Sequence, residues 1–332
     1  MSEPLRLLMS EAAWDRWADR AQQACGNRPL QWVCLEEAVR TQRRDLEAAF
    51  ISRDVTGRST KHQPEPALQA CHELLLANGH LRWVHIHSAG ADRPAYVQLH
   101  QRGVAVTTSS GANAQVVAAT ALAGILALAR RFPMLWAQQQ RREWNPLLGP
   151  GRMPRDLPGQ TVTLLGWGPI GQTLARLLTG LGLQVTAIRT KAAADAQGVR
   201  MRIYGELSEV LPQTDWLVLA CPLTPQTRQL VNAPLLAALP NRAHLVNVSR
   251  GEVVDEAALI QALQGGHLAG AFLDVFAHEP LAADSPLWSL PQVIVTPHGA
   301  GHSDGNEQRV GEMFIDNLRR WCAGQDLLNR VS

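Results

Sequence analysis

The stretch at residues 161–191, TVTLLGWGPIGQTLARLLTGLGLQVTAIRTK, decides how this chain folds. It begins with an apolar, β-branched run at residues 161–165, which is typical of a buried strand. A helical pattern follows, with apolar residues at positions 170, 174, 177, 178 and 181. A second apolar run at residues 183–188 predicts another strand. The order strand, glycine-rich turn, helix, strand predicts a parallel α/β unit.

Three glycines in this stretch have GxGxxG spacing. Gly166 permits a tight turn, Gly168 lets a pyrophosphate approach the backbone, and Gly171 lets the helix pack close to the strand. The first helical turn then offers unpaired amides and the positive end of the helix dipole to phosphate groups. We therefore predict a dinucleotide site, against the alternative of a structural turn. The expected contacts from this turn are Gly166, Gly168, Pro169, Ile170 and Gly171.

The end of the second strand indicates which dinucleotide is preferred. A carboxylate usually stands there when the cofactor is NAD, because it accepts hydrogen bonds from the ribose hydroxyls. This chain instead has Arg189, Thr190 and Lys191. A guanidinium and an ammonium would bind a 2′-phosphate, which a carboxylate would repel. We expect NADP(H) to be preferred, with NAD(H) as the alternative cofactor and a solvated basic loop as the structural alternative.

Composition limits the class of protein. The 332 residues are enough for two domains, and 46% apolar with 18% charged residues is ordinary for a soluble enzyme. A net charge of +2 gives no reason to expect a nucleic-acid or membrane partner. The five cysteines lack metal-site spacing, so we expect reduced thiols, no metal site and a cytoplasmic location. The N-terminus lacks the apolar core of a signal peptide, and we interpret the weakly polar run at residues 112–129 as a buried helix.

The rest of the chain also alternates between strand and helix patterns, which predicts two parallel α/β domains. A flavodoxin-like substrate domain is expected from residues 1–112 and 302–332, and a doubly wound, Rossmann-type cofactor domain from residues 113–301. The helix predicted at residues 306–322 would fold back on the first domain. Residues 36–47 are expected to form a helix, and residues 53–66 and 130–158 to form polar loops. Further strands are predicted at residues 216–220, 244–248, 270–273 and 293–296.

Three polar residues follow predicted strands of the second domain. Arg250, Glu279 and His298 each stand just beyond a strand, where open α/β sheets bind ligands. A guanidinium suits a carboxylate, an imidazole suits proton transfer near neutral pH, and a carboxylate beside it favours the imidazolium. Singly, each has an ordinary structural explanation. Together they predict the reduction of a 2-oxo acid.

Five stretches carry a resemblance to the D-isomer-specific 2-hydroxyacid dehydrogenase family, and they fall in order across most of residues 161–301. They are GWGPIGQTLARLLTGLG, CPLTPQTRQLVN, LVNVSRGEVVDEAALIQAL, FLDVFAHEP and VIVTPHGAG. The resemblance is weaker at HSAGAD and at GQDLLNRV, near the two ends of the chain.

The resemblance implies roles for individual residues. Arg250 would orient the substrate, Glu279 and His298 would form the acid–base pair, and the amides of Ala89 and Gly90 would hold the substrate carboxylate. Asp274 would lie near the nicotinamide carboxamide. Further contacts with the cofactor are expected from Cys221, Pro222, Thr227, Val248, Ser249, His298 and Ala300.

The resemblance also implies two-lobed subunits, a homodimer formed through the long linking helix, and a product of D configuration. Two departures stand out. The family often carries an acidic residue and a histidine or tyrosine in its linking helix. This chain has Ala118, Ala119 and Thr120 at those positions, which bears on the expected dimer contact. After His298 the family more commonly has isoleucine, then glycine or alanine, then glycine. This chain has Gly299-Ala300-Gly301-His302 there, which alters the expected nicotinamide pocket.

The leading hypothesis is an NADPH-dependent reductase of a small 2-oxo acid resembling glyoxylate or hydroxypyruvate. The alternatives are an NAD-dependent dehydrogenase of the phosphoglycerate type and a non-catalytic dinucleotide sensor. The basic cluster at residues 189–191 argues against the first. The presence of Arg250, Glu279 and His298 together argues against the second, because a sensor has no need of all three.

Overall fold

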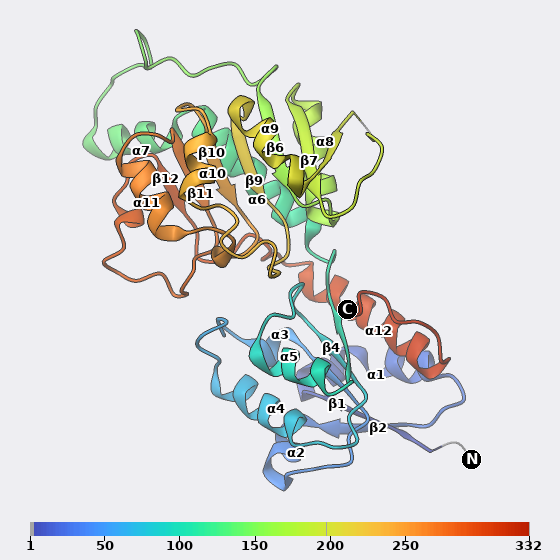
Figure 1. Ribbon diagram of the computed structural model, residues 1–332. Helices are drawn as coiled ribbons and strands as arrows, with labels where there is room; N and C mark the ends of the chain where they lie inside the picture. The colour runs from blue at the N-terminus through green and yellow to red at the C-terminus, as the bar shows by residue number, and fades with distance from the viewer. Residues whose placement is uncertain (1–2, 197, 332) are drawn as a thin grey trace. The chain divides into compact units, whose positions relative to one another are not determined.

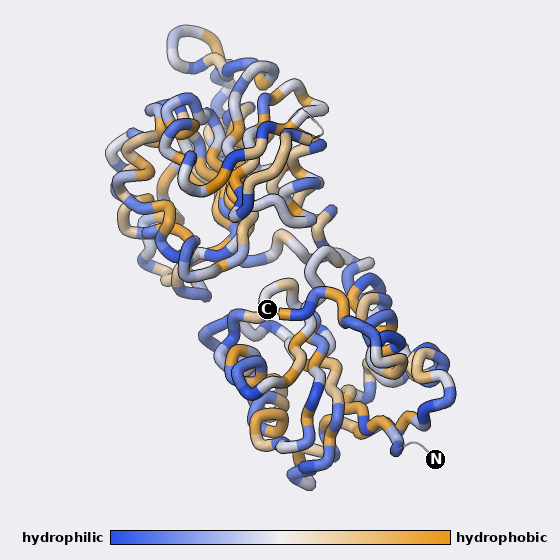
Figure 2. The backbone as a smooth tube through the Cα atoms, turned by 45° about the vertical axis from the view of Figure 1, so that its right-hand side comes forward, coloured by the Kyte–Doolittle hydropathy of each residue, from blue (hydrophilic) through white to orange (hydrophobic). Residues whose placement is uncertain are grey.

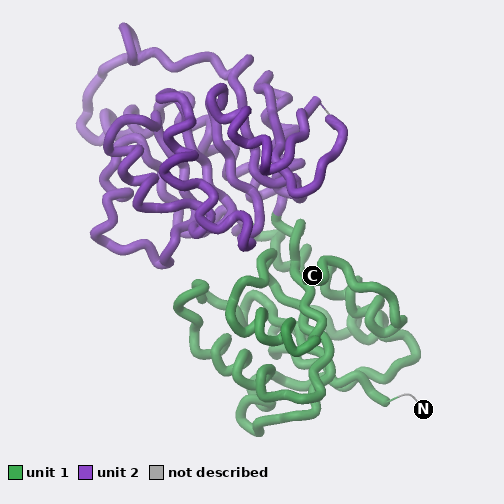
Figure 3. Tube along the Cα trace, viewed as in Figure 1, with its two compact units in different colours: residues 1–113, 303–332 green, residues 114–302 purple. Residues whose placement is uncertain are grey.

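The computed structural model describes residues 3–196 and 198–331. The chain divides into two compact units, one formed by residues 1–113 with 303–332 and the other by residues 114–302 (Figure 3). In both units the hydrophobic residues concentrate in the strands and on the helix faces that cover them (Figure 2). Each unit therefore has its own buried core.

The first unit contains a five-stranded parallel sheet of order β2-β1-β3-β4-β5 (Figure 1). This is the order of flavodoxin-like doubly wound folds, which agrees with the expected fold class. Four strands are buried along nearly their whole length, as expected for a parallel sheet covered on both faces. The strands are β1 (Leu5–Met9), β2 (Leu30–Cys34), β3 (Ala48–Ile51), β4 (Trp83–Ile86) and β5 (Ala105–Thr108).

Helices cover both faces of this sheet. On one face, α1 (Glu11–Cys25) packs beside α12 (Asn306–Cys322), so the C-terminal helix does fold back on the first unit. Phe314 of α12 stacks on Phe50 of β3 with ring centroids 4.2 Å apart. The other face is covered by α2 (Leu35–Thr41), α4 (Pro66–Leu76) and α5 (Pro94–Gln101).

The second unit contains a seven-stranded parallel sheet of order β12-β11-β10-β9-β6-β7-β8. The chain direction of the crossovers reverses between β6 and β9, which is the topological switch point where Rossmann folds bind nucleotides. The strands are β6 (Thr161–Leu165), β7 (Gln184–Arg189), β8 (Arg200–Ile203), β9 (Trp216–Leu219), β10 (His244–Asn247), β11 (Gly270–Leu273) and β12 (Val293–Val295).

The two faces of the second sheet are covered by different helices. One face packs against α6 (Ala114–Ala129) and α8 (Pro169–Gly180), and a Cβ on Gly124 would lie 2.4 Å from the Phe272 ring. The helix and the strand below it are therefore in direct contact. The other face packs against α9 (Leu207–Val210), α10 (Ala233–Ala238) and α11 (Glu256–Gln264). Short 3₁₀ turns complete the unit at Tyr204–Glu206, Leu211–Gln213, Gly251–Val253 and Pro286–Trp288.

Some of the predicted element boundaries were wrong. The connector at residues 130–158 contains α7 (Phe132–Arg141), where a proline in the first turn starts a helix. The expected loop at residues 53–66 begins with α3 (Arg53–Thr56). The helix expected at residues 36–47 ends at Thr41, because Gln42 adopts the left-handed conformation with φ of 52°. Helix α5 and strand β8 were not predicted.

Among the described residues no single helix combines the length and the apolar composition needed to cross a bilayer. Helices α6 and α7 meet that requirement only when they are joined, and they are bent by 67° at the break between them.

Candidate active site

Three neighbouring strands of the second unit carry the candidate catalytic residues beyond their carboxyl ends. Arg250 follows β10, Glu279 follows β11 and His298 follows β12. Oε2 of Glu279 lies 2.7 Å from Nδ1 of His298, and Oε1 accepts a hydrogen bond of 3.1 Å from the amide of Phe276. The Glu279 side chain is 12% exposed, and the His298 side chain is 48% exposed. The carboxylate thus lies behind a ring that solvent can reach.

The charge of Glu279 is set by opposing effects. Burial raises the pKa of this carboxyl, because a buried anion loses hydration. The hydrogen bond from His298, the amide of Phe276 and the charge of Arg250 act in the other direction, and the net pKa is lowered. Glu279 is therefore an anion at neutral pH and can stabilise a cationic partner.

The loop that carries His298 is held by Asp274. His298 has a positive φ of 50°, which is uncommon for a residue other than glycine, and its amide donates to the Asp274 carbonyl at 2.8 Å. The carboxylate of Asp274 accepts hydrogen bonds from Thr296 Oγ1 at 2.6 Å and from the amides of Gly299 and Ala300 at 2.9 and 3.0 Å. Asp274 is 2% exposed, so its contact with a cofactor remains a prediction, whereas its support of the His298 loop is direct.

The Arg250 loop has its own support. Asn247 is buried, and its Nδ2 donates to the carbonyl of Arg250 at 3.1 Å. Its Oδ1 accepts hydrogen bonds from both the amide and the hydroxyl of Ser249. Ser249 and Val248 are themselves buried, so any contact of these residues with a cofactor would be made mainly by their backbone atoms.

The glycine-rich turn has the shape that a dinucleotide needs. Gly166 has a φ of 107°, and a Cβ there would lie 2.7 Å from the Ala220 carbonyl oxygen. A Cβ on Gly171 would lie 2.2 Å from the Gly166 carbonyl oxygen. Gly168 is the N-cap of α8, and a Cβ there would meet no atom within 4 Å. The chain therefore leaves the backbone uncrowded at Gly168, where the start of α8 would meet a phosphate.

Basic residues end β7 beside this turn. Arg189 is half-buried, and Thr190 and Lys191 are exposed. Across residues 3–196 and 198–331, neither Arg189 nor Lys191 forms a side-chain ion pair or hydrogen bond. Both cations are thus available to an anion outside the chain.

The loop after β9 is built largely by its own hydrogen bonds. Thr227 is buried, and its hydroxyl donates to the Pro222 carbonyl at 2.7 Å. Cys221 is buried, which raises the pKa of its thiol to about 11, so it is a neutral packing residue at physiological pH. Pro222 is exposed on the loop.

The predicted substrate loop belongs to the first unit. Ala89 is exposed and Gly90 half-buried, and the Ser88 hydroxyl donates to the Gly90 carbonyl at 2.8 Å. Lys61 forms an ion pair of 3.2 Å with Asp92 at the end of the same loop. Arg93 donates to the Ser59 carbonyl at 2.9 Å, so the segment after α3 is tied to this loop. His85 of β4 is fully buried, and its two ring nitrogens lie within hydrogen-bond distance of Thr107 and Ser109.

The sequence model of the D-isomer specific 2-hydroxyacid dehydrogenase NAD-binding domain matches residues 122–300, which is more than half of the chain. The chain belongs to the D-isomer-specific 2-hydroxyacid dehydrogenase family. It is therefore an oxidoreductase that binds a nicotinamide dinucleotide. This outcome confirms the resemblance that the five sequence motifs carry.

Curated members of the D-2-hydroxyacid dehydrogenase family include similar reductases. The chain is 34% identical over 269 residues to a glyoxylate reductase of Korarchaeum cryptofilum, covering 78% of this chain and 79% of that protein. It is 34% identical over 289 residues to glyoxylate/hydroxypyruvate reductase B of Yersinia enterocolitica, covering 82% of this chain and 88% of that protein.

Solved D-2-hydroxyacid dehydrogenase structures are also similar. One, from Xanthobacter autotrophicus Py2 in complex with NADPH and MES, has a TM-score of 0.77 and 29% identity, covering 100% of this chain and 98% of that one. Another, from Aeromonas salmonicida, has a TM-score of 0.79 and 27% identity, covering 100% and 99%. Both agree with the two-unit α/β architecture.

Two residues that support the candidate site are not predicted by the sequence analysis. Asn247 supports the Arg250 loop, and Glu256 accepts a hydrogen bond from the Ala277 amide at 3.0 Å. Both stand inside motifs quoted above, where a polar residue ends a strand or starts a helix. Such a position is a usable signal, but the loop that each residue contacts follows only from the tertiary structure. Among the described residues, no group of three or more His, Cys, Asp or Glu could hold a metal ion.

Proposed function

We propose that the protein reduces a small 2-oxo acid of the glyoxylate or hydroxypyruvate type with NADPH, and that the product is a D-2-hydroxy acid. The observation that carries this proposal is the 2.7 Å contact between Glu279 and His298, at the sheet edge that also bears the glycine-rich turn. A proton donor, an anion that stabilises its charged form, and the charge of Arg250 are the groups that this reaction requires.

Each of the three residues has a distinct task in the proposed reaction. With its pyrophosphate at the glycine-rich turn, the dinucleotide would supply the hydride for the ketone carbon from its nicotinamide ring. Arg250 binds the substrate carboxylate and polarises the ketone through its planar guanidinium. His298 donates a proton to the ketone oxygen from Nε2, because Nδ1 is held by Glu279. Glu279 orients the ring and stabilises the imidazolium before transfer. The amides of Ala89 and Gly90 would bind the substrate carboxylate as well.

The preference for NADPH rests on the end of β7. Arg189 and Lys191 flank Thr190 where an NAD-preferring site carries a carboxylate, and both cations are available to a phosphate. A doubly charged 2′-phosphate would gain charge-assisted hydrogen bonds there. The reductive direction follows, because cellular NADPH pools are kept reduced. The cytoplasm, where cysteines stay reduced, is the proposed location.

A homodimer is also proposed. Exposed large apolar residues gather in one segment of the second unit, on α7 and the connector after it. Exposed apolar residues that occur as a group mark a protein contact more often than singly scattered ones do. The exposed face of α6 carries Ala119 and Ala123, whose small side chains leave room for close approach. A second copy of the chain is the proposed occupant. The apolar residues are Phe132, Trp136, Trp144, Leu148 and Met153, which are 43%, 48%, 97%, 69% and 61% exposed.

A panel of 2-oxo acids with both cofactors tests the proposed reaction. Loss of absorbance at the nicotinamide band is followed with glyoxylate, hydroxypyruvate, pyruvate and a bulky branched 2-oxo acid. We expect kcat/KM to be highest for a small 2-oxo acid with NADPH and lower for the bulky branched one. Nucleotide binding without turnover of any member would instead identify a dinucleotide sensor.

A further inference from the structure

The loop that carries Glu279 is held from behind by a residue that the proposed mechanism does not use. Glu256 is the first residue of α11, and its Oε2 accepts a hydrogen bond of 3.0 Å from the amide of Ala277. The preceding residue, Phe276, donates its own amide to Oε1 of Glu279 at 3.1 Å. Two successive amides of one loop therefore point to two carboxylates, one that supports the loop and one that faces His298.

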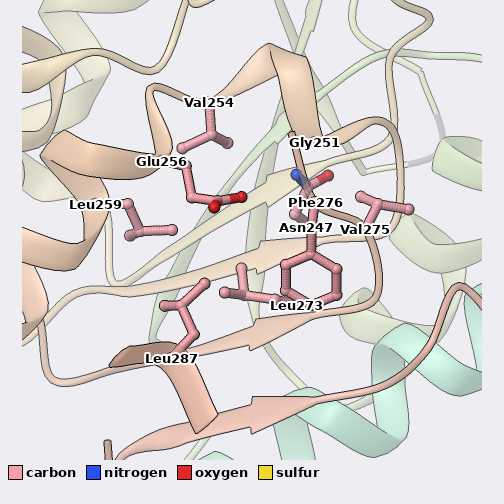
Figure 4. Close-up of a pocket in the computed structure, with 9 residues that line it drawn as sticks. All are labelled: Asn247, Gly251, Val254, Glu256, Leu259, Leu273, Val275, Phe276 and Leu287. Atoms are coloured by element: carbon pink, nitrogen blue, oxygen red, sulfur yellow. The ribbon is translucent and has the colours of Figure 1, made fainter. Parts of the chain in front are cut away.

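Glu256 reaches the loop through apolar surroundings. Nine described residues line a small cavity below the loop, and of these only Glu256 and Asn247 have polar side chains (Figure 4). The Glu256 carboxylate extends from the start of α11 toward Phe276. A hydrogen bond is stronger where water is scarce, and a carboxylate there needs a donor. Glu256 and Ala277 are both half-buried, so the bond is partly shielded from water, and it gives the carboxylate that donor.

The same loop also touches the segment that carries Arg250. A Cβ on Gly251 would lie 1.8 Å from the carbonyl carbon of Phe276 and 2.3 Å from the amide nitrogen of Ala277. The backbone after Arg250 thus packs directly on the backbone that Glu256 holds. A shift of the loop would move Glu279 and would also open the contact beside Arg250.

We propose that Glu256 is a positioning residue, which fixes the Phe276–Glu279 loop through the Ala277 amide and so sets where Glu279 meets His298. The expected change in kcat rests on the proposed reductase function. The expected loss of order in the Phe276–Glu279 loop rests on the hydrogen bonds alone. The property that matters is the reach of the side chain to Ala277. Its negative charge at the start of α11 matters less.

Two conservative variants separate reach from charge. Glu256→Gln keeps a carbonyl oxygen at the same distance and loses the charge. Glu256→Asp keeps the charge at the helix N-terminus and is one methylene too short to reach Ala277. We expect kcat with NADPH and the best 2-oxo acid to stay within about threefold in the Gln variant and to fall about 10- to 100-fold in the Asp variant, because small misplacements of catalytic groups cost rates of that order. The KM for NADPH should stay within about twofold in both, since the glycine-rich turn is untouched.

A matched control accounts for the stability of the helix. Asp255 is the N-cap of α11 and accepts a hydrogen bond from the Ala258 amide at 3.1 Å. Asp255→Ala removes this cap and keeps the bond to Ala277, so it should lower stability and leave kcat within about threefold. Equal losses of kcat in Asp255→Ala and Glu256→Asp would overturn the proposal, as would a Gln variant no better than the Asp variant.

Hydrogen exchange gives a readout that does not depend on turnover. By mass spectrometry, peptides covering residues 274–280 should exchange faster in Glu256→Asp than in the wild type, with the Gln variant close to the wild type. Unchanged exchange in the Asp variant would overturn the proposal even if activity fell. If the wild type reduced no 2-oxo acid, the proposed function would fail, and the exchange comparison would still decide whether Glu256 holds the loop.

Discussion

Nδ1 of His298 lies 2.7 Å from Oε2 of Glu279, although the two residues are joined to different strands, β12 and β11. Because those strands are parallel neighbours, their carboxyl ends bring the two loops to one edge of the sheet. The contact fixes the orientation of the imidazole and leaves Nε2 for a substrate. The proposed acid–base function of His298 therefore depends on both loops keeping their geometry.

Glu279→Gln should impair the chemical step while binding persists. The amide can still accept a hydrogen bond, but it is neutral and no longer stabilises an imidazolium. We expect kcat to fall about 10²-fold, within the range that general acid catalysis contributes. Steady-state kinetics check this, with NADPH affinity from fluorescence titration expected to stay within about twofold. A kcat within threefold of the wild type would show that the Glu279 charge is dispensable.

Arg189→Asp should reverse the cofactor preference. The new carboxylate would repel a 2′-phosphate and accept bonds from ribose hydroxyls. We expect the ratio of kcat/KM for NADPH to that for NADH to fall about 30-fold, because a charge-assisted hydrogen bond contributes about 2 kcal/mol and each ~1.4 kcal/mol is a factor of ten. Arg44→Asp makes the same charge change on the exposed surface of the first unit and should leave the ratio unchanged. A ratio unaltered by Arg189→Asp would assign phosphate recognition to another group.

Asp215 makes a pH-dependent contribution to stability. Burial raises the pKa of this carboxyl, but Arg155, the amide of Thr161 and Arg242 bond to it and lower the pKa from 3.8 to about 2. The unfolded chain therefore binds this proton more tightly than the native one, and the stabilisation is present above pH 4 and is lost as the pH falls toward about 2. It corresponds to about 2 kcal/mol at neutral pH.

Urea unfolding of Asp215→Asn checks that contribution. The variant should be less stable than the wild type by about 2 kcal/mol at pH 7, and the difference should shrink as the pH is lowered from about 5 toward 2. A difference that stayed constant over this range would mean that the charge of Asp215 is not what stabilises the native state.

Trp136→Asp should weaken the proposed dimer. The charge would be placed on the exposed apolar face of α7 and would have to be desolvated in an interface. Sedimentation equilibrium should show a dimer for the wild type and a monomer, or a dimer weakened at least about 100-fold, for the variant. Trp288→Asp is the matched control, because Trp288 is 53% exposed and lies outside this segment. A monomeric wild type, or a dimer that survives Trp136→Asp, would contradict the proposed surface.

The sequence was most informative where a local pattern carries the structure. The glycine spacing and the two flanking strands predicted the β6–α8–β7 unit, because turn, helix start and strand all depend on neighbouring residues. Helix α7 is not predicted, because the glycines and prolines at residues 149–154 favour a loop and mask the helical segment that precedes them. The hydrogen bonds of Asp274 and Glu256 could not be predicted, because their partners lie on separate loops that only the folded sheet brings together.

The most direct test of the proposed reaction is single-turnover reduction of the best 2-oxo acid by enzyme-bound NADPH, in the wild type and in His298→Asn. The asparagine cannot donate an acidic proton, so the rate should fall at least about 10³-fold while NADPH binding is retained. His278→Asn, at an exposed neighbouring histidine, should react at the wild-type rate. A His298→Asn enzyme that reduced the substrate within tenfold of the wild-type rate would contradict the proposal that His298 is the acid.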